Sequence, residues 1–153
     1  MSRWARALGA AAVAVFAASQ VSHAAAPSAP GHHAGHVSTW ISAAVKVMKA
    51  DGTPVSVLNR ADIALIIRNE SGGNPDAVNR SDANAAAGDP SRGLTQTTSR
   101  TFSTYCLPGY CSDITDPVSN IIAGVRYALA RYGSLGRVPG VAAVRDGLPY
   151  VGY

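Results

Sequence analysis

Apolar residues recur at three- and four-residue spacing in separate segments of this 153-residue chain. That spacing places the apolar side chains on one face of a helix. It predicts helices from Val37, over residues 60–70 and from Pro117, with a shorter helix over residues 97–105. No alternating apolar pattern of strand type is longer than four residues. The sequence therefore predicts a mainly α fold, and the length suits one domain.

Capping residues flank two of the predicted helices. Asn59 precedes the second helix, and Asp116 precedes Pro117 at the start of the last one. Asn and Asp are favoured N-caps, and Pro suits the first helical turn. Gly72 and Gly133 follow these two helices, where glycine commonly ends a helix. The caps indicate where both helices begin and end.

The first 26 residues have the features of a signal peptide. Arg3 and Arg6 form a basic start, and an apolar run over residues 7–18 follows. Small residues then offer cleavage sites near Ala24 or Ala26. The apolar run is shorter than the roughly 20 residues that a membrane span needs. We therefore expect residues 1–26 to direct secretion and to be removed, with an uncleaved anchor as the alternative. No membrane span is expected in the mature chain.

Residues 27–36 are rich in Pro, Ala, Gly and His, which predicts a flexible linker before a domain over residues 37–153. His32 and His36 have the spacing of a helical metal pair, but the nearby Pro and Gly disfavour a helix, so no metal site is expected. The whole chain has 13 Lys and Arg against 9 Asp and Glu. Loss of the signal peptide leaves 11 against 9, a net charge of +2. This charge is too small to indicate a nucleic-acid partner.

The two cysteines, Cys106 and Cys111, flank a Pro108-Gly109 turn pair. An exported chain meets an oxidising compartment, so a disulfide is the first interpretation. A two-thiol metal site or a redox pair is the alternative. Both are disfavoured because Cys-x-x-Cys spacing is missing.

Glu70 is the only glutamate of the chain. It lies on the helix face of Ile63, Ile66 and Ile67, one turn before the Gly72-Gly73 break. Partial burial and the negative end of a helix both disfavour a charged carboxylate and raise its pKa. Such a carboxylic acid can donate a proton to a glycosidic oxygen. The alternative is a solvent-exposed carboxylate at a helix end.

A polar loop follows Glu70 over residues 74–93 and is rich in Asn, Asp, Gly, Ser and Ala. Asn79, Asp82 and Asn84 suit the hydroxyl groups of a sugar, but such residues also fill ordinary turns. The loop is a candidate wall of a substrate groove.

Three motifs follow one another along roughly half of the chain. They are Glu70-Ser71-Gly72-Gly73-Asn74-Pro75 with Ala77-Val78-Asn79, then Ser91-Arg92-Gly93-Leu94-Thr95-Gln96-Thr97, and then Asn120-Ile121-Ile122-Ala123-Gly124-Val125-Arg126-Tyr127. In this order they resemble the motifs of the transglycosylase SLT domain family, although the second has Thr95 where methionine is usual in the family. The Asp82–Ala85 and Arg131–Ser134 stretches most resemble small secreted members from actinobacteria.

The resemblance implies a lysozyme-like single domain that cleaves the bond between N-acetylmuramic acid and N-acetylglucosamine in peptidoglycan. It assigns the role of acid and then base to Glu70, and a supporting role to Ser71. Gly93 and Gln96 are expected to face the sugar, and Tyr127 to lie near the carboxylate. The family's frequent late Ala-Tyr-Asn motif is missing, and the role of the C-terminal tail stays open.

A lone glutamate fits a lytic transglycosylase, which forms 1,6-anhydromuramic ends without water. The resemblance implies no metal and no cofactor, and we expect a monomer. One alternative is a lysozyme-type hydrolase in which Asp82 or Asp89 positions water. The other is a wall-binding protein without activity.

Overall fold

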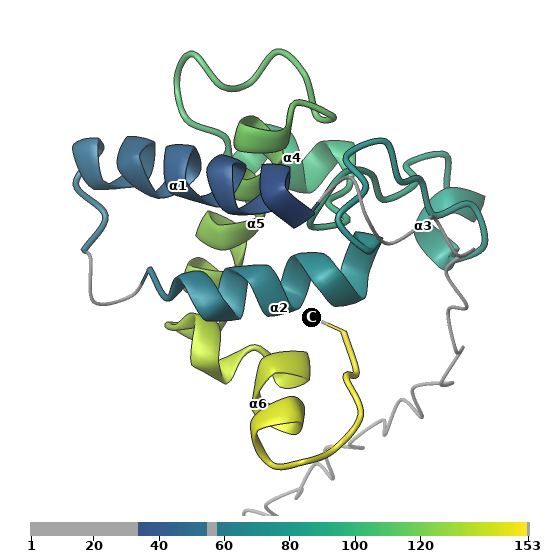
Figure 1. Cartoon of the computed structure of the whole chain (residues 1–153). Helices are drawn as coiled ribbons and strands as arrows, with labels where there is room; N and C mark the ends of the chain where they lie inside the picture. The colour runs from purple at the N-terminus through teal and green to yellow at the C-terminus, as the bar shows by residue number, and fades with distance from the viewer. Residues whose placement is uncertain (1–33, 55–57, 153) are drawn as a thin grey trace, which may run out of the picture.

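The computed structural model describes residues 34–54 and 58–152, and this part of the chain is mainly helical, as predicted (Figure 1). Strand-like pairing there is limited to isolated bridges that join Val78 with Arg92 and Arg92 with Thr97. Within these residues no helix has both the length and the apolar character to cross a bilayer. The elements are α1 (Ala34–Ala50), α2 (Arg60–Ser71), α3 (Ala83–Ala86), α4 (Ser99–Tyr105), α5 (Pro117–Tyr132), a 3-10 helix (Leu135–Arg137) and α6 (Pro139–Arg145).

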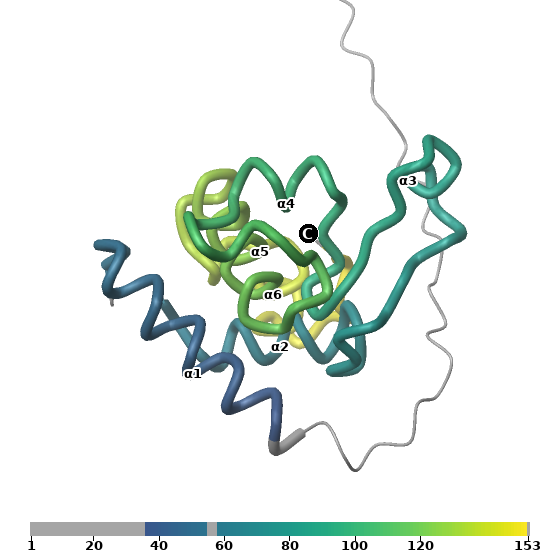
Figure 2. Tube along the Cα trace, turned by 90° about the horizontal axis from the view of Figure 1, so that it is seen from above, coloured from purple at the N-terminus to yellow at the C-terminus, as the bar shows by residue number. Residues whose placement is uncertain are grey.

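Helix α5 is the centre of the core. Ile121, Ile122 and Ala128 on this helix are completely buried, and its neighbours are α1 and α4. Each buried isoleucine contributes roughly 1.5–3 kcal/mol through loss of apolar surface from water. Figure 1 shows α5 crossing behind α1, and Figure 2 shows the long loop around α3 standing away from the other helices.

The predicted caps are confirmed. The Asn59 side chain accepts from the backbone N–H groups of Ala61 and Asp62, and Asp116 accepts from Ser119 at 2.8 Å. Gly72 and Gly133 end α2 and α5 with φ values of 63° and 78°, in the left-handed region that glycine enters without strain.

Helix α1 begins at Ala34, three residues before the predicted start at Val37. Residues 34–36 of the predicted linker are therefore helical. The His36 ring stacks on Trp40 one turn later, with ring centroids 5.7 Å apart, and Trp40 itself packs against the core. This contact offsets the low helix propensity of Gly35. The predicted signal peptide, residues 27–33 of the linker and His32 lie outside the described residues.

An ion pair between a buried carboxylate and a half-exposed arginine joins α2 to α6, a helix that the sequence pattern did not predict. One guanidinium nitrogen of Arg145 lies 2.7 and 2.8 Å from the two carboxylate oxygens of Asp62. The Asp62 side chain is 7% exposed and that of Arg145 is 50% exposed, so the pair is open to solvent on one side only. Removal of Arg145 would leave a buried carboxylate without its cation, which is costly.

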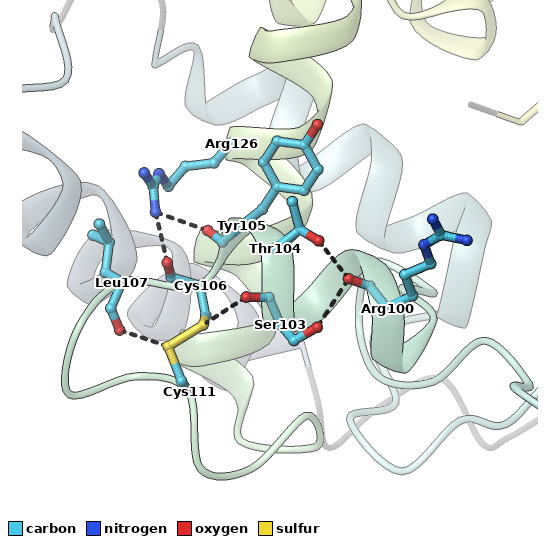
Figure 3. Close-up of a disulfide and its surroundings, with 8 residues drawn as sticks. All are labelled: Arg100, Ser103, Thr104, Tyr105, Cys106, Leu107, Cys111 and Arg126. Atoms are coloured by element: carbon cyan, nitrogen blue, oxygen red, sulfur yellow. Dashed lines mark hydrogen bonds between the residues drawn. A yellow bond between two sulfur atoms is a disulfide. The ribbon is translucent and has the colours of Figure 1, made fainter.

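The predicted disulfide between Cys106 and Cys111 is present, with the two Cα atoms 5.3 Å apart. Arg126 on α5 donates to the carbonyl oxygens of Tyr105 at 2.9 Å and Cys106 at 2.7 Å (Figure 3). These bonds fix the end of α4 on α5.

Asn120 holds the Gly93–Thr97 segment on α5 and is completely buried. Its amide nitrogen donates to the carbonyl oxygens of Arg92 and Ile114 and to the Thr97 hydroxyl, at 2.8 to 3.2 Å. Its amide oxygen accepts from the backbone N–H and the hydroxyl of Thr95, both at 2.8 Å. One side chain is thus within hydrogen-bonding distance of five polar groups, of which those of Thr95 and Thr97 are buried.

Replacement of Asn120 by Ala should destabilise the domain by roughly 3 kcal/mol, because buried polar partners lose their hydrogen bonds. Urea unfolding followed by circular dichroism measures this effect. The exposed Asn84 is the control, and Asn84→Ala should change stability by less than about 0.5 kcal/mol. Equal stability of the two variants would contradict the assigned role of Asn120.

Candidate active site

Glu70 lies in the last turn of α2, where the predicted apolar face ends. Ile63, Ile66 and Ile67 on that face are 1 to 3% exposed, and Glu70 is half-buried. The Tyr150 hydroxyl donates to Oε1 of Glu70 at 2.7 Å. The predicted placement of the carboxylate is therefore correct, and a tyrosine 80 residues away holds it.

The C-terminal segment brings Tyr150 to this position by packing on α6. The Gly140 N–H donates to the Gly152 carbonyl oxygen, and the Leu148 N–H donates to that of Ala143, both at 2.8 Å. A Cβ atom at Gly140 would lie 2.3 Å from the Tyr150 ring, so only glycine admits the ring here. Figure 1 shows this segment, in yellow, returning from α6 to α2.

Ser71 links the end of α2 to the second sequence motif. Its hydroxyl donates to the Leu94 carbonyl oxygen at 2.8 Å, lies 3.1 Å from that of Ile67, and accepts from the Gly73 N–H at 3.2 Å. Because Ser71 follows Glu70 directly, these bonds fix the position of the glutamate relative to Leu94.

The Gly93–Gln96 segment is shaped by contacts with α5. Gly93 has a φ of 77°, and a Cβ atom there would lie 2.3 Å from the Asn120 amide nitrogen. A Cβ atom at Gly124 would lie 2.3 Å from the Thr95 hydroxyl. Thr95, which stands where the family usually has methionine, thus hydrogen-bonds to Asn120 and packs against Gly124, where a side chain would not fit.

Gln96 has a φ of 49°, the one positive value at a residue other than glycine among those described. Its amide nitrogen donates to the carbonyl oxygens of Gly93 at 2.9 Å and Ala77 at 3.3 Å. The sequence predicts that this side chain faces a sugar, and the structure shows that its amide nitrogen also binds the backbone of the loop.

The polar loop uses two of its three candidate sugar-binding residues in its own turns. Asn79 donates to Asp82 at 2.9 Å and accepts from the Ser81 N–H at 3.0 Å. Asp82 caps α3 by accepting from the Ala85 N–H at 2.8 Å. Asn84 is exposed on α3.

Asp89 binds the first turn of α4, whose N-cap residue is Thr98, and the sequence analysis did not assign this role. Its two carboxylate oxygens accept from the backbone N–H groups of Ser99 at 2.8 Å and Arg100 at 3.2 Å. Burial alone would raise the pKa of Asp89. The hydrogen bonds from Ser99 and Arg100, together with the charge of Arg92, outweigh burial and hold that pKa below its usual value.

Tyr127 lies on α5 and packs edge-on against Tyr105 at the end of α4, with ring centroids 5.5 Å apart. Burial raises the pKa of the Tyr127 hydroxyl, and the neighbouring Tyr132 adds to this rise. Tyr127 lies on the same face of α5 as Asn120 and Gly124, one turn after Gly124. It is therefore next to the residues that contact Thr95.

Two contributors to the site escaped sequence reasoning. Tyr150 lies in a tail with no helical periodicity, outside the motif where the family places a late tyrosine. Gly140 is one of 15 glycines, and its importance depends on a ring that packs on it from ten residues later. The Leu148-Pro149-Tyr150 sequence carries no signal that indicates either contact.

The described residues form a mainly helical domain with a half-buried glutamate in the last turn of α2, and this architecture is consistent with the lysozyme-like all-α fold. The chain belongs to the family described as "Transglycosylase SLT domain", which it matches over residues 56–144. Tyr150 lies beyond the matched residues.

A protein of Bacillus subtilis (strain 168) named "Uncharacterized protein YqbO" is 45% identical over 130 residues. The match covers 85% of this chain but only 8% of that protein, so the chain corresponds to a small part of its relative. No solved structure matches.

Proposed function

We propose that the chain is a peptidoglycan lytic transglycosylase that cleaves the β-1,4 bond between N-acetylmuramic acid and N-acetylglucosamine, with Glu70 as general acid and base. Membership of the family supports a glycan-cleaving, transglycosylase-type enzyme that acts on peptidoglycan. The observation that carries the catalytic assignment is the half-buried carboxyl of Glu70 and its 2.7 Å bond to Tyr150.

The proposed reaction needs one carboxyl group. Glu70 donates its proton to the glycosidic oxygen as the bond to C1 of muramic acid breaks, and the N-acetyl oxygen of that sugar stabilises C1. The Glu70 carboxylate then takes the proton of the 6-hydroxyl, whose oxygen bonds to C1 and closes the 1,6-anhydro ring. The proton returns to Glu70, so acid and base are the same group and water is not consumed.

Tyr150 is suited to hold Glu70 through this cycle. A phenol hydroxyl donates to an ionised carboxylate and can equally accept from a protonated one. The contact can therefore persist when Glu70 gains or loses its proton. We infer that Tyr150 is a positioning residue that keeps the carboxyl group aimed at the glycosidic oxygen.

The residues around Glu70 divide into supports and sugar contacts in this proposal. Ser71 fixes the end of α2. Asn79, Asp82 and Gln96 contact the glycan in this proposal, as part of a loop that their own hydrogen bonds shape. The further sugar contacts are the backbone at Gly93 and the side chains of Asn84 and Tyr127.

The hydrolase alternative requires a second carboxylate that activates water. Asp82 accepts from the Ala85 N–H and from Asn79, and Asp89 accepts from the Ser99 and Arg100 N–H groups. Despite the opposing effect of burial, the hydrogen bonds from Ser99 and Arg100 and the charge of Arg92 hold the pKa of Asp89 below its usual value, which makes it a weak base. Both candidates accept hydrogen bonds from backbone N–H groups at the start of a helix, which favours the transglycosylase.

The setting of this activity belongs to the same proposal. Peptidoglycan lies outside the cytoplasm, and a disulfide persists in an oxidising compartment, so both support a secreted protein that acts in the cell wall. We further propose a monomer of the small secreted actinobacterial type that needs neither metal nor cofactor.

Replacement of Glu70 by Gln keeps the shape and removes the acid, so cleavage of purified peptidoglycan should fall by about 10²- to 10⁴-fold, the usual contribution of a general acid. Release of soluble muropeptides measures the rate. Asp76, an exposed acid of the neighbouring loop, is the control, and Asp76→Asn should leave the rate unchanged.

Comparison of wild type with Glu70→Gln also distinguishes an enzyme from a wall-binding protein without activity. Sedimentation with insoluble peptidoglycan should show that Glu70→Gln still binds. If wild type and Glu70→Gln release equal traces of product, the wall-binding interpretation replaces the enzyme.

Tyr150→Phe removes only the hydroxyl that donates to Glu70. The rate should fall by about tenfold, the equivalent of one lost hydrogen bond. The matched control is Tyr110→Phe in the disulfide loop, which should keep the rate within about twofold. Equal rates for both variants would remove Tyr150 from the proposed mechanism.

A further inference from the structure

Three tyrosines and an arginine gather where α4 ends and α5 makes its last turns. Tyr105 packs edge-on against Tyr127, with an angle of 70° between the rings. The Arg131 guanidinium lies 5.6 Å from the Tyr132 ring centroid, and its Nε donates to the Tyr132 hydroxyl at 3.2 Å. We call Tyr105, Tyr127, Arg131 and Tyr132 the tyrosine–arginine cluster. The proposed cleavage reaction gives a role only to Tyr127 among these four residues.

The cluster rests on fixed backbone. Arg126 binds the carbonyl oxygens of Tyr105 and Cys106, and the Cys106–Cys111 disulfide closes the loop that follows (Figure 3). Tyr127 projects from the central helix. A surface that is already ordered loses little conformational entropy when a ligand binds.

The charge of the cluster is positive and open to solvent. Arg131 is exposed, and the ion pair found within residues 34–54 and 58–152 joins Arg145 with Asp62 rather than Arg131 with an acid. The hydrogen bond to Tyr132 raises the pKa of Arg131 above its usual value, so the guanidinium keeps its charge. An exposed guanidinium flanked by aromatic rings is suited to a planar anion.

Tyr127 and Arg131 of the cluster lie on the same face of α5 as the residues that shape the candidate active site. Asn120, Gly124, Tyr127 and Arg131 follow at helical spacing, and the first two contact Thr95. A ligand that extends from the Gly93–Gln96 segment along α5 would therefore reach Tyr127 and then Arg131.

We propose that the tyrosine–arginine cluster binds a carboxylate of the peptide stem of peptidoglycan, with Arg131 as the ion-pair partner. The proposal rests on the proposed function, because it takes peptidoglycan as the substrate. Tyrosine rings alone would suit a neutral sugar face, which gains little from a guanidinium. Arginine donates in a planar fork that matches a carboxylate, and the nearby hydroxyls add further donors.

The direct test is a nuclear magnetic resonance titration of the full mature chain with a synthetic stem tetrapeptide, L-Ala-γ-D-Glu-L-Lys-D-Ala. The aromatic ring signals of the protein's Tyr105 and Tyr127 should shift as peptide is added, and the shifts should reach a plateau. The same peptide with both carboxylates converted to amides should bind at least about fivefold more weakly, which is the effect of one exposed ion pair. Equal binding of the two peptides would overturn the proposal.

Variants identify the residue. Arg131→Ala should weaken binding of the acidic peptide by about fivefold, and Arg131→Lys should restore part of it. Arg137→Ala, at an exposed arginine of the neighbouring 3-10 helix, is the matched control and should bind like wild type. If Arg131→Ala and Arg137→Ala bind alike, the cluster is not the site.

The Glu70→Gln variant separates this inference from the proposed function. It should bind the acidic peptide like wild type, because Glu70 is not part of the cluster. Cleavage by Glu70→Gln at the wild-type rate would refute the catalytic proposal and leave the peptide result standing. Normal loss of cleavage without any peptide binding would refute the cluster alone.

Discussion

The buried side-chain amide of Asn120 is the interaction on which the site depends. It binds Thr95 through its oxygen and the backbone of Arg92 through its nitrogen, and so fixes the Gly93–Thr97 segment on the central helix. Ser71 then binds the Leu94 carbonyl oxygen from the other side. The end of α2, and Glu70 with it, is thereby positioned against the central helix through two successive sets of hydrogen bonds.

The features that the sequence predicted correctly are those encoded by residues close together in the chain. Helix periodicity and caps are local signals, so the cores of α2 and α5 and the caps at Asn59 and Asp116 followed directly from the residues. The disulfide joins cysteines five residues apart, and its loop contains a turn pair. The placement of Glu70 followed from its register with Ile63, Ile66 and Ile67.

Long-range contacts and polar side chains were harder to predict. Tyr150 reaches Glu70 across 80 residues, and no local pattern encodes that contact. Asp82, Asp89 and Gln96 are candidates for contact with a sugar or with water, and the structure adds that their side chains bind backbone groups of the loop and of α4. Composition alone cannot separate these uses, because a turn and a sugar offer the same donors and acceptors.

The site therefore combines one sheltered carboxyl group with aspartates that bind the first turns of helices. In the reaction that we propose, the substrate itself completes the chemistry, because its 6-hydroxyl attacks C1 after Glu70 has given up its proton. Gly140 contributes to the position of Glu70, because the absence of a side chain there lets the Tyr150 ring pack closely enough for its hydroxyl to bind the carboxylate.

Digestion of purified peptidoglycan in water enriched in ¹⁸O, followed by mass spectrometry of the released muropeptides, tests the single-carboxyl account most directly. The account predicts 1,6-anhydromuramic ends that carry no ¹⁸O, because no water enters the reaction. Reducing ends that carry ¹⁸O at C1 would contradict it and would show that a second group activates water.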